Sequence, residues 1–429
     1  MLLLSLSRPL TFPKAVRILL PIVSLCILFP SVLQAAEWSL KGSLDQSLGY
    51  DDNVRMLSKD SLFPGSRGSF KYRIIPVLTF LHKTEVSEIQ ADASYGTQIY
   101  TDIPQFDQDI QNYSLSGLYK TARFDWGLST NLSVTPARNT AALNSGDFNT
   151  NSDRTSWSVS PSVSYKIDEL NSIILSPSYS ETSFTSSGSS PTNSTNFRNN
   201  TSTNIGLAWQ RLWNERYTSN VNFFYSNFSS PRTTAIGEST FDSVGINFSN
   251  TYVWSQNWNI DGTVGARHTQ STIGTVSNGS FGFLANVGIN YTGESFSSGI
   301  SFNRSLTPSN QGQLQEQTGA SLHFRYKIAE RLSAGLTTSY TQSTSVNEPG
   351  LVNGINQLSS RKRENIVVEP SVSWSLSPDW TLAGSYRYRT QQGGLTGGDN
   401  ITNDVNGVAE SNLFILSINY NWQGLKLSR

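Results

Sequence analysis

The stretch FGFLANVGINY, residues 281–291, alternates apolar residues with small or polar ones, with Leu284 as the single exception. Its apolar phase consists of Phe281, Phe283, Ala285, Val287, Ile289 and Tyr291. Successive side chains of a β-strand point to opposite faces, so this period of two predicts a strand with one apolar face. The same alternation recurs along the chain, for example in residues 124–134, 322–328, 382–389 and 414–422. Because helical periodicity is almost absent, we expect an all-β protein.

The connections between these strands alternate between tight turns and longer loops rich in Ser, Asn, Gly and Thr. The tight turns lie near residues 83–87, 120–122, 168–171, 213–216, 255–257, 292–294, 329–331 and 377–379; the longer loops include 51–66, 137–152 and 270–278. Outer-membrane barrels have tilted strands of about 10 residues, short periplasmic turns and longer outer loops. The sequence therefore predicts a transmembrane antiparallel up-and-down β-barrel of about 18 strands (16–18), with periplasmic N- and C-termini.

The first 36 residues have the features of a secretory signal. Basic residues at Arg8, Lys14 and Arg17 precede an apolar run, and small residues at Ala35 and Ala36 offer a cleavage site. We expect residues 1–36 to be removed, which leaves residues 37–429 as the barrel. The single cysteine, Cys26, lies in the removed part, so the mature chain has no thiol for a disulfide. No later apolar run reaches 18 residues, which excludes an α-helical membrane protein.

The composition argues against several classes of function. The chain carries no net charge and only 14% charged residues, whereas a nucleic-acid binder has a basic excess. The three histidines are scattered without metal-binding spacing, and no glycine-rich phosphate loop is recognisable. We therefore expect no catalytic residue, no cofactor and no metal, and we do not expect an enzyme. A Ser/His/Asp site assembled across strands remains an alternative.

The tryptophans are concentrated at one end of the expected strands. Those near a tight turn or a chain end are Trp38, Trp126, Trp209, Trp213, Trp254, Trp258, Trp374, Trp380 and Trp422. Such clustering predicts an aromatic girdle at one membrane interface, with outer-membrane lipid as the partner of the apolar face. The apolar faces are modest, so a large soluble β-sandwich remains an alternative at this point.

The polar phase of the strands would line the lumen of such a barrel. It is mostly Ser and Asn, with sparse charges of both signs, and we expect these residues to line the transport path: Lys71, Arg73, Asp92, Arg123, Asp125, Asp261, Arg267, His323, Arg325, Glu369, Arg387 and Arg389. A hydroxyl- and amide-rich lumen suits a neutral or weakly acidic sugar chain. Equally, any porin lumen is polar and its charges can pair with one another, so both interpretations stay open.

The segment LGYDDNVRM, residues 48–56, follows the first mature strand and contains Tyr50, Asp51, Asp52 and Asn53. It resembles the YDDN element of the β-barrel porin 2 family, which includes barrels encoded with exopolysaccharide biosynthesis operons. The turn-and-strand phrases SPDWTLAGSYRYR (residues 377–389) and AERLSAGLTTSY (residues 329–340) are similar to that family too.

This resemblance covers essentially the whole mature chain and implies an integral outer-membrane barrel. It implies that a polysaccharide chain passes through the barrel to the cell surface. The implied partner is a periplasmic polysaccharide-export protein that lacks a membrane-spanning part of its own. A general or oligosaccharide-uptake porin and a structural or adhesive barrel remain the alternatives.

Four expected strands have a proline near the middle: Pro76, Pro161, Pro177 and Pro370. Proline has no N–H for a sheet ladder and is normally confined to edges or bulges. All four belong to the apolar phase, and their distances from the tight turns predict a common depth in the membrane. Pairing the two expected strands on either side of the tight turn at Glu169 places Pro161 opposite Pro177. We therefore expect small bulges or kinks at these prolines.

Overall fold

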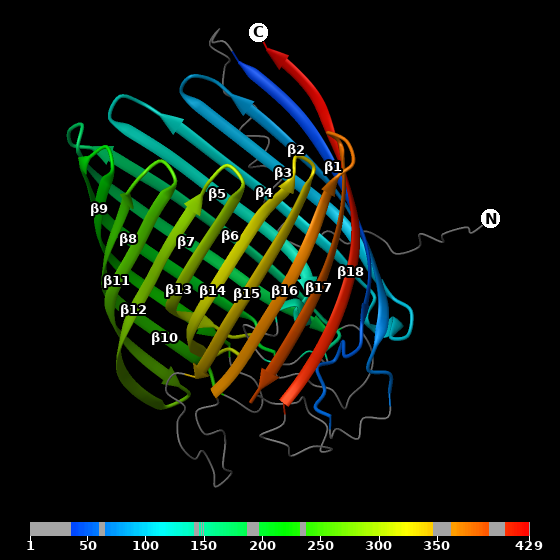
Figure 1. The fold of residues 1–429 in the computed structure, drawn as a ribbon. Coiled ribbons are helices and arrows are strands. Elements are labelled where there is room, and N and C mark those ends of the chain that lie inside the picture. The colour runs from blue at the N-terminus through cyan, green and yellow to red at the C-terminus, as the bar shows by residue number, and fades with distance from the viewer. Residues whose placement is uncertain are drawn as a thin grey trace.

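The chain folds into one closed antiparallel barrel of eighteen strands (Figure 1). The computed structural model describes residues 36–59, 65–140, 146, 148, 150–186, 197–231, 237–345, 362–393 and 408–428. Each strand pairs with its neighbours in sequence, and β18 returns to pair with β1, which closes the barrel. The predicted fold class and the strand number of 18 are confirmed.

The strands are 13 to 21 residues long and are joined in sequence order. Their bounds are β1 Glu37–Asp51, β2 Ser69–Lys83, β3 Ser87–Tyr100, β4 Gln108–Lys120, β5 Phe124–Pro136, β6 Ser152–Lys166, β7 Asn171–Ser186, β8 Asn200–Asn214, β9 Tyr217–Ser230, β10 Ser239–Val253, β11 Trp258–Ile273, β12 Val276–Thr292, β13 Phe296–Pro308, β14 Leu314–Ala329, β15 Leu332–Ser345, β16 Lys362–Ser375, β17 Trp380–Gln392 and β18 Val408–Ser428. Two short 3₁₀ helices, η1 Pro104–Phe106 and η2 Ala137–Thr140, lie in the outer connections.

The eight tight turns predicted from the sequence lie at one end of the barrel, and the connections between them, of which β11–β12 is itself short, lie at the other end (Figure 1). Glu37 pairs with Ser428 at the tight-turn end, so the first and last described strands start and finish there. One expected loop is wrong: residues 270–278 are largely strand, because β11 runs to Ile273 and β12 begins at Val276. Their Ser and Thr side chains resemble loop composition but bond across the pair, as in the Thr272–Ser277 contact of 3.0 Å.

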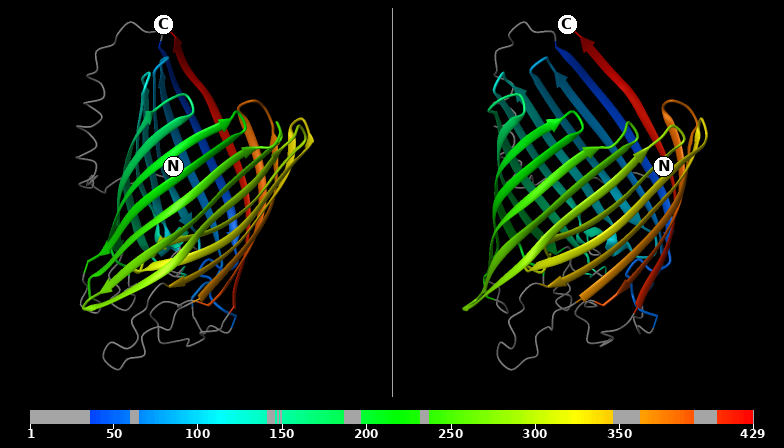
Figure 2. Two further views of the ribbon diagram at one scale, coloured as in Figure 1. Left: turned by 90° about the vertical axis from the view of Figure 1, so that its left-hand side faces the viewer. Right: turned by 60° about the vertical axis from the view of Figure 1, so that its left-hand side comes forward.

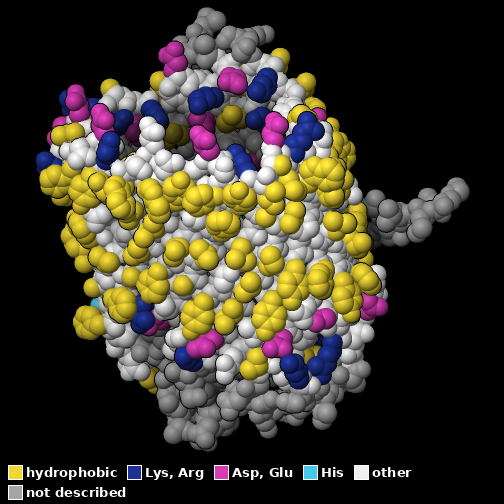
Figure 3. All heavy atoms as spheres, viewed as in Figure 1, with side chains coloured by type: hydrophobic (Ala, Val, Ile, Leu, Met, Phe, Trp, Pro, Cys, Tyr) yellow, Lys and Arg dark blue, Asp and Glu magenta, His cyan; other side chains and the backbone are white. Residues whose placement is uncertain are grey.

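The outside of the barrel is apolar and the inside is polar. Two further views show the strongly tilted, continuous wall (Figure 2). A broad belt of apolar side chains covers the wall, and charged side chains gather towards its two ends (Figure 3). Large side chains such as Leu207, Val264 and Leu416 are exposed on this surface. The apolar phase therefore faces outward around a closed wall, which excludes the soluble sandwich.

The predicted tryptophan girdle lies at the tight-turn end. All nine tryptophans that we assigned to it are exposed, from 39% for Trp258 to 60% for Trp254. The tenth, Trp157, instead donates a hydrogen bond from its indole nitrogen to the Glu181 carboxylate at 3.1 Å. Indole rings favour the interface between lipid and water, so the girdle of nine tryptophans marks one membrane boundary.

A second aromatic belt, which sequence reasoning missed, marks the other boundary. Five strands that ascend from a tight turn carry an outward tyrosine eight residues after their first residue: Tyr95, Tyr179, Tyr225, Tyr340 and Tyr388. Three of their hydroxyls donate to carboxylates of the neighbouring strand, Asp109, Asp242 and Glu410. Eight residues of strand span about 26 Å, or about 20 Å along the axis at a 40° tilt, close to the height of a lipid-facing band.

Each of the four prolines interrupts one ladder without a bulge. The β6–β7 ladder stops at the pair Val159–Tyr179 and resumes in the same register at Val163–Leu175, with Pro161 opposite Pro177 as predicted. The ladders beside Pro76 and Pro370 also pause and resume in register, so the predicted bulges are wrong. Each proline removes an N–H but adds no residue to its strand. Because Pro161 and Pro177 lie opposite each other, the β6–β7 ladder has one interruption, between Val159 and Val163, rather than two separate ones.

Candidate functional site

Eleven of the twelve residues that we expected in the lumen lie on the inward phase of their strands. Lys71 and Arg73 flank the outward Tyr72, for example, and His323 and Arg325 flank the outward Phe324. The exception is Arg123, which lies in the tight turn before β5 and is exposed there. Its expected place in the lumen is wrong because β5 begins one residue later.

Most of these inward charges are neutralised by a partner on an adjacent or nearby strand. Ion pairs join Arg73 to Asp45 at 2.9 Å, Lys166 to Asp125 at 2.8 Å, Arg387 to Glu369 at 2.8 Å, Arg389 to Asp51 at 3.5 Å and Arg267 to Glu316 at 3.5 Å. Asp92 instead accepts hydrogen bonds from Thr79, Gln90 and Ser114. The lumen wall therefore presents hydroxyls, amides and paired charges rather than a strong field of one sign.

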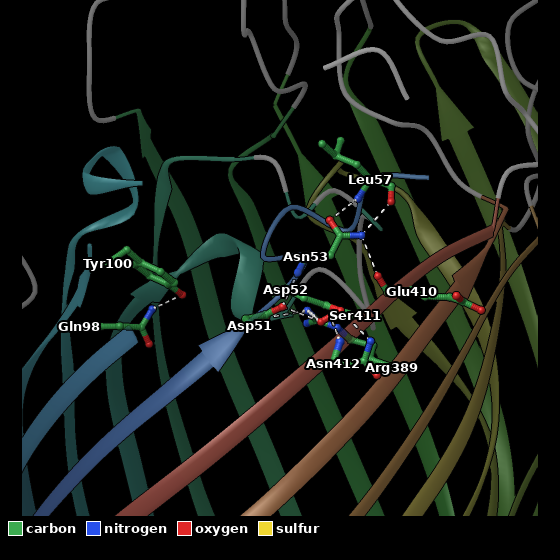
Figure 4. Close-up of polar contacts among 10 residues, drawn as sticks. All are labelled: Asp51, Asp52, Asn53, Leu57, Gln98, Tyr100, Arg389, Glu410, Ser411 and Asn412. Carbon is green, nitrogen blue, oxygen red and sulfur yellow. Dashed lines mark hydrogen bonds and ion pairs between the residues drawn. The ribbon is translucent and has the colours of Figure 1, made fainter. Parts of the chain in front are cut away.

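The YDDN segment joins the two ends of the barrel wall at its outer rim (Figure 4). The Asp51 carboxylate accepts a hydrogen bond from the Ser411 hydroxyl at 2.7 Å and faces the Arg389 guanidinium. The Asp52 carboxylate accepts from both the backbone and the side-chain nitrogen of Asn412, each at 2.7 Å. These contacts tie the end of β1 to β18, so the two acids stabilise the strand junction that closes the barrel.

Asn53 completes this junction. Its side-chain nitrogen donates to the Glu410 carbonyl at 2.7 Å and to the Leu57 carbonyl at 2.8 Å, and its side-chain oxygen accepts from the Leu57 N–H at 3.0 Å. The same residue therefore folds the first outer loop back on itself and fixes it to β18. Tyr50 differs from the other three because it points outward, where its ring packs at a tilt against Phe70.

The outer end of the lumen holds an arginine–aromatic cluster built from three outer connections and β3. The Arg138 guanidinium of η2 lies 4.2 Å from the centre of the Phe106 ring and 4.9 Å from that of Tyr100. The Arg55 guanidinium lies 4.6 Å from the same Phe106 ring. Burial lowers the pKa of both arginines, and Arg138 lowers that of Arg55 further. Both cations are thus held against aromatic faces instead of water.

Connections from opposite walls meet across this end of the lumen. The Thr140 hydroxyl, after β5, lies 3.4 Å from the side-chain nitrogen of Asn310, which joins β13 to β14 on the far side of the ring of strands. The Gly146 carbonyl accepts a hydrogen bond from Gln391 of β17 at 2.9 Å.

Phe148 extends the same bridge. Its ring packs with Met56 and Ala409 and lies 4.6 Å from the Arg389 guanidinium. Thr140, Gly146 and Phe148 of the β5–β6 connection therefore contact β17, β18 and the β13–β14 turn across the outer mouth.

No protein-family model matches the sequence, and no curated protein matches it. Solved structures of similar fold include OccK5 (OpdH) of Pseudomonas aeruginosa, with 10% identity, a TM-score of 0.44, and coverage of 89% of this chain and 98% of that one. OccAB3 of Acinetobacter baumannii shows 9% identity, a TM-score of 0.45, and coverage of 90% and 99%. The FrpB iron transporter of Neisseria meningitidis shows 9% identity, a TM-score of 0.46, and coverage of 89% and 81%.

At TM-scores of 0.44 to 0.46, the similarity to these structures adds nothing to what the strand pairing of the chain already shows. Within the described part of the chain, no helix is long and apolar enough to cross a membrane. Closure of the sheet gives every strand two hydrogen-bonded neighbours, with interruptions at the prolines, and the apolar exterior lies between two aromatic belts. The protein is an integral β-barrel of the outer membrane.

Proposed function

We propose that the protein is an outer-membrane exit channel for a polysaccharide chain, working with a periplasmic polysaccharide-export protein. Two features support this proposal. The wall is rich in serine and asparagine and its charges are largely paired, which suits many weak contacts with hydroxyl groups. The YDDN segment and the turn-and-strand phrases resemble the family of barrels encoded with exopolysaccharide operons.

The observation that carries the proposal is the bridge across the outer mouth. Contacts between Thr140 and Asn310, and between Phe148 and Arg389, join walls that lie far apart in the ring of strands. A general diffusion porin needs a permanently open path, whereas a channel dedicated to a polymer benefits from staying closed until its cargo arrives. The bridge therefore favours a dedicated channel over an open pore.

Deletion of the gene tests this function directly. We expect the deletion strain to lose surface and secreted polysaccharide and to recover it when the intact gene is restored. Extracted polymer should be measured both outside the cells and in the periplasm, because a blocked exit predicts accumulation inside. Unchanged amounts of external polymer would refute the export role.

The second candidate is an oligosaccharide-uptake porin, which the same hydroxyl-rich wall would also suit. It predicts a growth or uptake defect on sugars after deletion and a steady open conductance of the purified barrel in a planar bilayer. An export channel with a closed outer mouth predicts neither.

Removing the Phe148 ring should open the outer mouth. Phe148→Ala loses the packing against Met56 and Ala409 and the contact with Arg389, so the bridging connection should leave the wall more often. We expect several-fold more frequent channel openings in a planar bilayer than for the unmodified barrel. Phe70→Ala is the matched control, since that ring lies on the outer surface beside Tyr50. Equal opening frequencies for both variants would show that Phe148 does not hold the mouth closed.

A further inference from the structure

Five inward polar side chains on β10 to β14 lie flat against the barrel wall, each over a glycine of the neighbouring strand. We call Asn247, Asp261, Asn290, Asn303 and His323 the polar row. In the sheet register, Asn247 faces Gly265 and Asp261 faces Gly288. Asn303 faces Gly319, and Gly299 lies between Asn290 and His323.

The glycines are what allow these side chains to lie flat. A Cβ added at Gly288 would lie 2.6 Å from an Asp261 carboxylate oxygen, and one added at Gly319 would lie 2.6 Å from the Asn303 amide oxygen. A Cβ at Gly265 or Gly299 would also collide with the polar side chain beside it. Gly288, Gly299 and Gly319 are buried beneath their neighbours, while His323 is exposed to the lumen. The polar row thus forms a flat polar surface on the inner wall of the barrel, facing the lumen.

Within the described part of the chain, the hydrogen-bonding capacity of the row is unused. Among the described residues, none accepts from or donates to the five side chains, and none forms an ion pair with them. This differs from the charges elsewhere in the lumen, where Arg73, Arg387 and Arg389 all have acidic partners. Amide groups and imidazole both donate and accept hydrogen bonds, so the row offers many free sites of either kind to a molecule in the lumen.

The row occupies two levels along the direction of passage. Asp261 and Gly299 lie three residues after the start of β11 and β13, whereas Gly265 and Asn303 lie seven residues after it. Four residues of strand span about 13 Å, or about 10 Å along the barrel axis at a 40° tilt, so a chain in the lumen would contact both levels at once. Glycine inside a strand weakens it by about 0.5–1 kcal/mol relative to alanine. The stability of the barrel wall therefore gives no reason for glycine at positions 265, 288, 299 and 319.

From this geometry we infer that the polar row is the contact surface for an uncharged, hydroxyl-rich saccharide chain inside the lumen. The inference rests on the proposed function and deepens it by naming the cargo class. The row contains no lysine or arginine and one carboxylate, Asp261, so it has nothing to attract an anionic polymer. Several weak contacts at two levels bind a sugar chain loosely enough for it to move.

Glycine-to-alanine variants test the row without removing any polar group. Gly288→Ala and Gly319→Ala displace Asp261 and Asn303 from the wall, and only side-chain atoms lie within 3 Å of the added Cβ. Gly262→Ala and Gly384→Ala are the matched controls, because a Cβ at either position meets nothing within 4 Å. The probe is maltohexaose, titrated against the purified, folded barrel in detergent and followed by calorimetry. Losing one or two hydrogen bonds of about 1 kcal/mol each predicts roughly fivefold or greater weakening for the first pair, and unchanged affinity for the controls.

Asn303→Ala is the second variant in case Gly319→Ala does not fold, and it should weaken binding in the same direction. Equal affinities across the glycine variants and Asn303→Ala, or no binding of maltohexaose to the unmodified barrel, would overturn the row as a saccharide surface. Tighter binding of a polyuronate than of maltohexaose would overturn the assignment to uncharged cargo. Gene deletion separates the two proposals: unchanged external polymer refutes export, whereas the binding result for the row stands by itself.

Discussion

Replacing Leu322 by arginine is expected to prevent stable assembly of the barrel. Leu322 lies on the outward phase of β14 and is 37% exposed there, opposite the outward Ile300 of β13. This level lies between the tryptophan girdle and the tyrosine belt, so the new charge would face the hydrocarbon. An arginine near the bilayer midplane of a β-barrel costs about 2–4 kcal/mol. The variant should be depleted from the outer-membrane fraction and should lack the fast-migrating folded form on an unheated gel.

Ser321→Arg provides the matched control. Ser321 precedes Leu322 on the same strand at nearly the same depth, but it faces the lumen and bonds to the Ser301 hydroxyl at 2.7 Å. Its arginine variant should assemble, because the charge would reach water in the lumen. Arg387→Ala should also leave assembly intact, since Arg387 faces inward and pairs with Glu369. Equal assembly of Leu322→Arg and Ser321→Arg would show that the assignment of inward and outward faces is wrong.

The alternation of residues 281–291 was sufficient to predict strands, and the alternation of turn lengths was sufficient to predict eighteen of them. Composition misled at residues 270–278, where Ser and Thr form a hairpin rather than a loop. The tyrosine belt was readable in principle, since a tyrosine recurs at a fixed offset from five tight turns. Bulges at the prolines were wrong because a missing N–H removes a rung without changing the register.

The site was less accessible to sequence reasoning because its parts depend on register and on distant contacts. Asn303 and Gly319 become a pair only when β13 and β14 are aligned, and no local pattern distinguishes that asparagine from its neighbours. Thr140 and Asn310 are 170 residues apart, and their contact depends on the course of two outer connections. The YDDN segment was recognised by resemblance alone, and its role at the strand junction needed the position of β18.

Replacing Asn53 by alanine is expected to loosen the junction between β1 and β18 at the outer rim. The buried Asn53 side chain makes three hydrogen bonds, to the N–H and the carbonyl of Leu57 and to the carbonyl of Glu410. Without the Asn53 side chain, backbone groups of Leu57 and Glu410 lose their partner. A buried polar group left without a partner costs about 1–3 kcal/mol, which is a large share of the free energy of unfolding of a typical protein. The first outer loop would lose its attachment to β18 at the same time.

Two measurements should reveal this loss. The purified Asn53→Ala barrel should unfold at lower urea concentration than the unmodified barrel, and an external protease should cleave the first outer loop faster on intact cells. Asn286→Ala is the control, since Asn286 lies on the inward phase of β12 and makes no side-chain hydrogen bond with the described residues. Because the lost hydrogen bonds lie at the rim, the relative increase in the cleavage rate should be larger than the relative decrease in the urea midpoint. Identical behaviour of the two variants would mean that the backbone ladder between β1 and β18 holds the junction without Asn53.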